Sequence, residues 1–306
     1  ASMGKMNTSL LRSFSFTALI GTAAAFAHAP VSRTASSLGL GMASAAADTF
    51  VRAWVSGERL GPDDFPPAPT SVDGLYETHL AIQVHPLVDS ELGGLGGYKL
   101  GAIGGAGEPC IYAPLFRGFF VDERDNAQKM STGAINLSAV EAEYGVVMGS
   151  DLPPRSDNGP YSAEEVWAAV DEVVLCIECC GKRGTPDAYA ASTKLGSFAD
   201  TLSSGGIVLG PRLSASTFEM DDLFGATKLF VNDEVVAEGS GANVPEGGPL
   251  QALTYLANHL NGRGLGLRQG ELVATGQTCA TKAFEVGDVV RATFGPLGEA
   301  KMVVAE

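Results

Sequence analysis

Two glutamates separated by one residue are the feature of the sequence best suited to chemistry. Glu141 and Glu143 lie in the mainly apolar segment Val140–Met148. Side chains of a β-strand alternate between its faces, so both carboxylates would project from one face, about 6–7 Å apart along the backbone. Turned inward, they would repel each other and their pKa values would rise, unless a cation joined them. Turned outward, they would be an ordinary acidic surface, so the pair alone leaves both alternatives open.

A third glutamate strengthens the case for a cation. Glu178 is the only charged residue in the apolar run 173–180. Such a run is typical of a strand buried on both faces, and a buried carboxylate needs a partner. Three carboxylates make a hard, oxygen-only site suited to Mg²⁺ or Mn²⁺. We therefore predict that Glu141, Glu143 and Glu178 bind a divalent cation.

Three of the five cysteines, Cys176, Cys179 and Cys180, crowd into the same run. Alternation along a strand would place Cys176 and Cys180 on the face of Glu178 and Cys179 on the opposite face. A zinc or iron–sulfur site is the alternative, but the two paired spacings usual for such sites are missing. Packed, reduced thiols fit better, and the crowding is unlike the disulfide framework of a small secreted domain.

A lysine between glycines is a further candidate. Lys99 lies in Gly97-Tyr98-Lys99-Leu100-Gly101, a strand with little side-chain bulk that a ligand can approach closely. Desolvated near a metal, its pKa could fall into a range useful for acid–base catalysis. The alternative is an exposed lysine on an edge strand, which would discourage aggregation.

Several common catalytic and binding motifs are missing from the sequence. It has neither a Gly-x-Ser-x-Gly nor a His-Glu-x-x-His motif, and the glycine-dense stretch 93–107 lacks the spacing of a phosphate loop or a dinucleotide fingerprint. Nucleotide binding is therefore disfavoured. The chain carries 35 acidic and 20 basic residues, a net charge of −15, which also disfavours nucleic acid as a partner. An acidic enzyme or binding protein remains.

The first 47 of the 306 residues differ in composition from the rest, because Asp48 is the first acidic residue. Lys5 and Arg12 precede the apolar run 16–26, which is too short to span a bilayer. A Ser/Ala-rich stretch follows, and segment 25–30 resembles the cleavage motif of two-part leaders that enter plastids bounded by extra membranes. We therefore expect residues 1–47 to be a targeting leader to a plastid, with no membrane association of the mature form. A secretory signal leading to export or to another organelle lumen is the alternative.

The remainder is expected to form one α+β domain, with a small helical portion at 48–92 and a β-rich portion at 93–306. The capping box at Ser162 and Glu165 supports one of the helices. The expected helices are Asp48–Gly57, Leu75–His85, Ser162–Asp171 and Leu250–Leu260. The expected strands are Tyr98–Ala102, Glu141–Met148, Glu172–Cys180, Gly206–Leu209, Lys228–Val231, Val235–Gly239, Glu271–Thr275, Val289–Thr293 and Lys301–Val304.

Taken together and in order, several segments resemble the 2-keto-4-pentenoate hydratase and oxo-acid decarboxylase branch of the fumarylacetoacetate hydrolase superfamily. The resemblance covers nearly all of residues 48–306. Its segments are Gly97–Gly101, Val140–Glu143, Glu178 in its strand, Asp200–Gly206 with Val208–Gly210, Leu256–Asn258, Leu267–Glu271, Thr275–Thr278, Gly287-Asp288 and Leu297-Gly298. The fold that it implies is a mixed β-sheet roll, like the C-terminal part of fumarylacetoacetate hydrolase, with peripheral helices, in a homo-oligomer.

The resemblance also implies roles for individual residues. Glu141, Glu143 and Glu178 would bind Mg²⁺ or Mn²⁺. Lys99, Asp200 and Ser203 would be catalytic, lining or flanking the substrate pocket. Thr275, Gly276 and Thr278 would close the metal pocket around a substrate carboxylate.

The activity implied is that of a metal-dependent hydro-lyase. It would add water to an unsaturated 2-oxo acid such as 2-hydroxypenta-2,4-dienoate, through a metal-chelated enolate. A 2-oxo-enedioate decarboxylase and an acylpyruvate hydrolase are the alternatives in the superfamily, and a non-catalytic plastid scaffold or binding protein is the alternative of another class. The chain departs from the family pattern at 179–184, where the family has an Asp-Ser-Arg-like segment, and at 103–107. These departures leave the substrate open.

Overall fold

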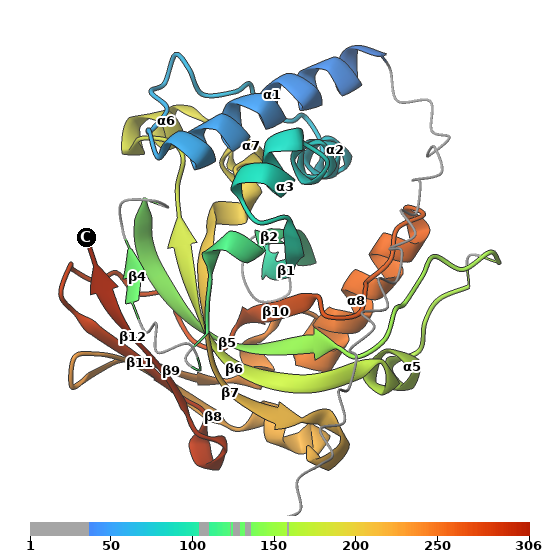
Figure 1. The fold of residues 1–306 in the computed structure, drawn as a ribbon, viewed down its shortest axis with the longest axis vertical. Helices are drawn as coiled ribbons and strands as arrows, with labels where there is room; N and C mark the ends of the chain where they lie inside the picture. Colours follow the sequence, from blue (N-terminus) through green and yellow to red (C-terminus); the bar gives the residue numbers. More distant parts are fainter. Residues whose placement is uncertain (1–36, 104–109, 123, 125–128, 132–135, 158) are drawn as a thin grey trace, which may run out of the picture. The chain divides into compact units, whose positions relative to one another are not determined.

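The strands pair into two mixed sheets in the described part of the chain (Figure 1), and strands of the first sheet contain apolar runs buried on both faces. The computed structural model describes residues 37–103, 110–122, 124, 129–131, 136–157 and 159–306. The first sheet has the order β2-β1-β10-β5-β6-β7-β3, and the second β4-β12-β11-β8-β9. Pairing is mainly antiparallel, with the parallel pairs β1–β10, β3–β7 and β4–β12. The predicted α+β class with mixed sheets and peripheral helices is confirmed.

The strand bounds extend those expected from the sequence. The first sheet contains β1 (Leu95–Ala102), β2 (Cys110–Phe116), β3 (Phe120–Asp122), β5 (Leu137–Met148), β6 (Val170–Gly181), β7 (Ser204–Ser214) and β10 (Leu272–Gln277). The second contains β4 (Lys129–Ser131), β8 (Ala226–Val231), β9 (Glu234–Ser240), β11 (Val289–Thr293) and β12 (Glu299–Ala305). All nine predicted strands are present, and β2, β3 and β4 were not predicted.

The two sheets pack against each other through β12, which lies against β6 and β7. Gly210 of β7 makes this approach possible, because a Cβ at this position would lie 2.7 Å from the Cβ of Ala300 on β12. The buried strands of both sheets belong to one large apolar core.

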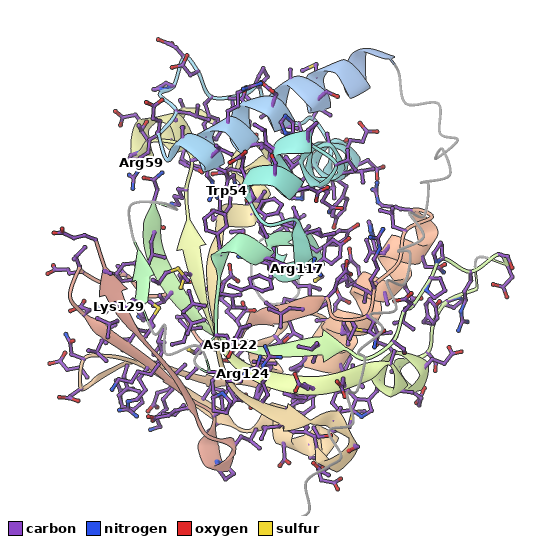
Figure 2. The ribbon with its side chains drawn as sticks, viewed as in Figure 1. Trp54, Arg59, Arg117, Asp122, Arg124 and Lys129 are labelled. Atoms are coloured by element: carbon purple, nitrogen blue, oxygen red, sulfur yellow. The ribbon has the colours of Figure 1, made fainter. Side chains whose placement is uncertain are left out.

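Helices cover the first sheet at two places. The helices are α1 (Ser37–Ser56), α2 (Val72–Gln83), α3 (Pro86–Glu91), α5 (Ala163–Ala168), α6 (Pro186–Ala191), α7 (Lys194–Ala199) and α8 (Pro249–Gly262). Helices α1, α2, α3, α6 and α7 gather on one side in Figure 1, while α8 packs on β10 and α5. Trp54 joins α1 to the sheet, because its ring lies 5.4 Å from that of Phe116 on β2 and 4.7 Å from that of Phe119 (Figure 2). None of the described helices is both long and apolar enough to cross a bilayer.

All four expected helices are present with different bounds; α8 spans Pro249–Gly262 rather than Leu250–Leu260. Helix α1 begins at Ser37 rather than Asp48, because its first half packs on the rest of the protein and buries Ala43, Ala46 and Ala47. The expected end of the leader at residue 47 therefore falls inside a helix; the expectations for residues 1–36 lie outside the described residues. Helix α2 ends at Gln83, short of His85, and the short helix α3 follows. Helix α5 has the predicted capping box but ends at Ala168, since β6 begins two residues later.

Candidate metal centre

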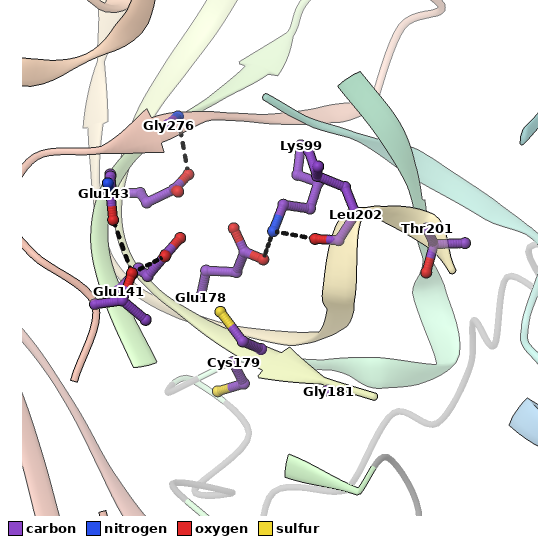
Figure 3. A network of polar contacts seen from close by, with 12 residues as sticks. Lys99, Glu141, Glu143, Glu178, Cys179, Gly181, Thr201, Leu202 and Gly276 are labelled. Carbon is purple, nitrogen blue, oxygen red and sulfur yellow. Dashed lines mark hydrogen bonds and ion pairs between the residues drawn. The ribbon is translucent and has the colours of Figure 1, made fainter. Parts of the chain in front are cut away.

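Pairing of two central strands brings two of the predicted metal ligands face to face. Glu141 of β5 lies directly opposite Glu178 of β6 in the antiparallel register. Glu143 is two residues farther along β5 and projects toward the same space (Figure 3). Glu143 and Glu178 are completely buried, and Glu141 is half-buried. Of the pair Glu141 and Glu143, the second therefore faces the interior and the first lies half-buried at its edge, so the pair is not an ordinary acidic surface.

One oxygen of each buried carboxylate has a protein partner and the other has none. Oε2 of Glu143 accepts the backbone N–H of Gly276 over 3.0 Å, and Oε1 of Glu178 accepts from Nζ of Lys99. Oε1 of Glu143 and Oε2 of Glu178 lack any hydrogen-bond partner among the described residues. An unpaired buried carboxylate oxygen is costly. This donor set fits a divalent cation, which would satisfy both free oxygens.

The backbone at Gly276 is shaped to reach Glu143. Gly276 has a φ of +116°, in a region where L side chains are strained. A Cβ there would also lie 2.8 Å from Cδ of Pro245. Glycine is thus required both by the conformation and by the space, and its N–H holds Glu143 in place.

The electrostatics of the cluster, with no cation bound, favour protonated carboxyl groups. Burial raises the pKa of Glu143 well above its usual range, and the nearby carboxylates of Glu178 and Glu141 raise it further. Burial also raises the pKa of Glu178, although Lys99 opposes the rise. A divalent cation would reverse this balance, because positive charge favours the ionised carboxylates.

Lys99 belongs to the same buried network rather than to an exposed edge. It lies on β1, between β2 and β10, and its side chain is almost fully buried. Nζ donates to Glu178 and, over 3.2 Å, to the carbonyl oxygen of Leu202 (Figure 3). Burial alone would lower the pKa of Lys99, but Glu178 and the other acidic groups outweigh it and the pKa rises. With no cation at the glutamates, Lys99 is therefore a firmly protonated group, suited to hold an anion.

An unusual turn presents the carbonyl of Leu202 to Lys99. Thr201, Leu202 and Ser203 all have positive φ values, of 45°, 54° and 56°. Three consecutive non-glycine residues in the left-handed region store strain, which is typical of a functional site. Ser203 lines the cavity described below, as its predicted role requires.

Asp200 begins this turn but lies behind the cavity. Its carboxylate accepts Nε of Arg183 over 2.6 Å, the backbone N–H of Arg183 over 2.8 Å and the hydroxyl of Tyr189. The guanidinium of Arg183 in turn stacks 4.0 Å from the ring centroid of Trp54. The structure thus commits Asp200 to a buried ion pair, where it supports the turn, and does not bring it to Lys99 as a proton carrier.

The hydroxyls of Thr275 and Thr278 bind the protein backbone, whereas the resemblance implied that these residues close the pocket around a substrate carboxylate. The hydroxyl of Thr275 donates to the carbonyl of Tyr144, and that of Thr278 to the carbonyl of Ala142, both over 2.8 Å. Both threonines are completely buried. Their hydroxyls fasten β10 to β5 and so set the position of the glutamates.

A cavity of about 690 Å³ opens beside the cluster. Lys99, Glu141 and Ser203 are the predicted site residues in its wall. The hydroxyl of Thr281, also in the wall, donates to Glu141 and lies 2.9 Å from Oε1 of Gln277. Other wall residues that the site prediction did not include are Leu100, Ser138, Cys180, Lys182, Leu202, Asn243, Val244 and Glu246.

Cys180 lies closer to two of the glutamates than the site prediction assumed. Its Sγ and one carboxylate oxygen from each of Glu141 and Glu178 all lie within 4.8 Å of one another. The alternation of β6 did place Cys180 on the face of Glu178, so this proximity had a signal in the sequence. Thr281 had none, because it follows the end of β10 in a segment without strand periodicity.

The fold is shared with solved enzymes of the fumarylacetoacetate hydrolase superfamily. The 4-oxalocrotonate decarboxylase from Pseudomonas putida G7, in complex with magnesium and adipate, superposes with a TM-score of 0.70 and 23% identity, over 89% of this chain and 99% of the decarboxylase. The fumarylpyruvate hydrolase from Pseudomonas aeruginosa, in complex with Mn²⁺ and pyruvate, superposes with a TM-score of 0.52 and 16% identity, over 68% of this chain and 88% of the hydrolase. At these identities the likeness shows the fold.

The sequence itself is similar to a hydratase. The 2-keto-4-pentenoate hydratase of Paraburkholderia xenovorans (strain LB400) is 32% identical over 176 residues, which cover 58% of this chain and 62% of the relative. The match thus spans less than two thirds of the relative's length. No known protein-family profile matches the chain. The resemblance in sequence is therefore confirmed to the hydratase over these 176 residues, and the likeness to the decarboxylase confirms the fold.

Proposed function

We propose that the protein is a divalent-metal-dependent hydro-lyase that adds water to an unsaturated 2-oxo acid. The observation that carries the proposal is the buried cluster of Glu143 and Glu178, each with a free oxygen, beside Lys99 and a cavity of about 690 Å³. Similarity to a 2-keto-4-pentenoate hydratase supports this chemistry over the alternatives.

Glu141, Glu143 and Glu178 would hold the cation, and Mg²⁺ or Mn²⁺ suits these oxygen donors. Bound there, the cation would supply a Lewis acid that stabilises negative charge developing on a 2-oxo acid. With the carboxylates bound to the cation, residues of the cavity wall would contact the side of the substrate that faces away from the metal.

Lys99 would take part in proton transfer on that side of the substrate. Its ammonium group is held between Glu178 and the carbonyl of Leu202, so Nζ has a fixed position. A cation on the glutamates would offset the negative charge that raises the pKa of Lys99, and Nζ could then transfer a proton to the substrate. Ser203, on the same strained turn, would contact the substrate or orient the water that adds to it.

Metal binding is the first test. We expect the wild-type protein to bind Mn²⁺ in isothermal titration calorimetry, and Glu178→Gln to weaken binding by more than the roughly 10–100-fold that the loss of a supporting residue costs. Glu238→Gln, which removes a carboxylate from an exposed ion pair with Lys228, is the control and should bind as the wild type does. Equal Mn²⁺ binding by all three proteins, or none by the wild type, would favour a non-catalytic scaffold.

The reaction is the second test. Incubation with 2-hydroxypenta-2,4-dienoate and, separately, with a 2-oxo-enedioate would be followed by mass spectrometry. Gain of water supports the hydro-lyase, whereas loss of CO₂ or cleavage of an acylpyruvate would assign one of the other chemistries. Lys99→Met should abolish turnover while Mn²⁺ still binds, because the lysine holds the proton and not the metal.

We also propose that the protein acts in a plastid, on the strength of the leader-like sequence 1–47. A fluorescent protein fused behind residues 1–47 should accumulate in plastids of a cell that has them. Secretion of the fusion would support the secretory alternative.

A further inference from the structure

One thiol of the cysteine-rich strand β6 faces the metal centre. Cys180 lies two residues beyond Glu178, so alternation along β6 puts both side chains on one face. Its Sγ and oxygens of Glu141 and Glu178 are mutually within 4.8 Å. Cys180 also belongs to the cavity wall and keeps 8% of its surface exposed, so a solute that enters the cavity reaches it.

The other two cysteines of the strand are placed differently. Cys179 points to the opposite side, where its Sγ lies 3.6 Å from Sδ of Met302. Cys176 packs in a small apolar cluster with residues such as Leu209 and Leu272. Neither lines the cavity, so the strand contains its own controls for the chemistry of Cys180.

Two carboxylates and a thiol form a mixed donor set. Oxygen donors alone favour hard cations such as Mg²⁺, whereas a thiolate favours zinc and softer metals. Donors around a tetrahedral zinc ion lie about 3.5 Å apart at ordinary bond lengths. The three atoms, already within 4.8 Å, need only a small side-chain adjustment to reach this geometry. Glu178 is completely buried and its Oε2 has no hydrogen-bond partner among the described residues, which independently points to a cation at this glutamate.

We propose that Cys180 is a ligand for thiophilic divalent cations, so that the centre binds Zn²⁺ or Cd²⁺ through sulfur as well as oxygen. The inference rests on the proposed function, since it assigns the cysteine to the same metal centre. Coordination replaces the thiol proton, which leaves to water in the cavity. As a result, the thiolate raises the affinity of the centre for Zn²⁺ and Cd²⁺ relative to Mg²⁺ and Mn²⁺, beyond what oxygen donors alone would give.

The test compares two metals in matched variants. Wild-type protein, Cys180→Ser and Cys179→Ala would be titrated with Cd²⁺ and, separately, with Mn²⁺, by calorimetry and by ultraviolet absorption for the sulfur-to-cadmium charge-transfer band. We expect a band in the wild type and in Cys179→Ala and none in Cys180→Ser. Cd²⁺ affinity should fall at least about tenfold in Cys180→Ser, while Mn²⁺ affinity stays within a few-fold of the wild type. X-ray absorption of the zinc-loaded wild type should show one sulfur neighbour at about 2.3 Å.

The outcomes separate this inference from the proposed function. An equal band and equal Cd²⁺ affinity in wild type and Cys180→Ser would overturn the role of Cys180, and so would a zinc shell that contains only oxygen and nitrogen. Binding of Mn²⁺ that Glu178→Gln abolishes would leave the proposed function standing in either case. Binding of neither metal by the wild type would overturn both. Should Cys180→Ser fold poorly, Cys180→Ala gives the same comparison.

Discussion

Arg183 and Asp200 form an ion pair that is completely buried behind the cavity, with Nε and Oδ1 2.6 Å apart. The carboxylate also accepts the hydroxyl of Tyr189, and the guanidinium stacks on Trp54 of α1. Asp200 in turn begins the left-handed turn that directs the carbonyl of Leu202 to Lys99. The ion pair therefore links helix α1 to the turn whose Leu202 carbonyl accepts from Lys99.

Asp200→Asn should destabilise the protein more than it disturbs the metal centre. Removing one partner leaves the buried charge of Arg183 uncompensated, which costs about 3–5 kcal/mol of unfolding free energy. Urea denaturation measures this loss, and Mn²⁺ affinity of the folded protein should change by less than about threefold because Asp200 is not a ligand.

Asp73→Asn is the matched control, because it breaks an ion pair between Asp73 and Arg263 in which the aspartate is mostly exposed. Its cost should be about 0–1 kcal/mol. If Asp200→Asn instead proved as stable as the control while turnover was abolished, Asp200 would take part in the reaction directly, as the sequence resemblance implied.

Gly276→Ala should weaken metal binding without removing a single ligand. A methyl group there meets Pro245 and is strained at a φ of +116°, so the N–H that holds Glu143 has to move. Displacing a group that orients a ligand typically costs about 10–100-fold in metal affinity. Calorimetric titration with Mn²⁺ measures this effect.

Gly287→Ala separates this effect from backbone strain alone. Gly287 also has a positive φ, of +96°, but a Cβ there has nothing within 4 Å. We expect this variant to lose about 1–2 kcal/mol of stability and no metal affinity. Equal metal affinity in both variants would mean that the Gly276 N–H does not position Glu143.

The glutamate cluster could be predicted because strand periodicity and burial determine its position locally. Glu141 and Glu143 share a face by alternation, and Glu178 is the lone charge of an apolar run. Both signals need only a dozen residues of sequence. The position of Lys99 between glycines was also visible, but not its depth, because the neighbouring strand β2 was not predicted.

The residues whose roles depend on distant partners could not be placed in this way. From the sequence Asp200 is an available carboxylate, because nothing indicates Arg183 as its partner. Their pairing joins the segment after β6 to the end of α7. Thr275 and Thr278 read as free hydroxyls until β10 pairs with β5 and their hydroxyls meet its carbonyls. The start of α1 was missed because its acid-free, Ala-rich composition is shared by transit peptides and by good helices.

Removal of residues 1–47 should therefore destabilise the protein, whereas removal of residues 1–36 should not. The methyl groups of Ala43, Ala46 and Ala47 are buried in the described structure, and burying three such groups contributes about 2 kcal/mol. Urea denaturation of chains that begin at residue 37 and at residue 48 measures the difference. Equal stability of the two would show that the first half of α1 adds nothing to the fold, and would restore residue 47 as a reasonable end of the leader.

His79 should make the stability of the protein depend on pH below neutrality. Its ring is completely buried, with Nδ1 3.1 Å from the carbonyl oxygen of Tyr112 and Nε2 2.9 Å from that of Phe198. Burial lowers the pKa of His79 to about 4, although both carbonyls favour the charged ring. In the unfolded chain the pKa is about 6.5.

These two pKa values determine whether stability rises or falls with pH. Between about pH 6.5 and 4 the unfolded chain binds a proton at this ring and the folded protein does not, so stability falls as the pH falls. The contribution is fully present above about pH 6.5, and about 2 kcal/mol of it should be lost between pH 7 and 5. Urea denaturation at both pH values should show a change in stability that is more unfavourable in the wild type than in His79→Asn by about 2 kcal/mol, because the buried glutamates contribute equally to both proteins. Nuclear magnetic resonance gives a second measurement that needs no variant, because the ring protons of His79 should keep their chemical shifts from pH 7 to 5; a titration centred near pH 6.5 would contradict the prediction.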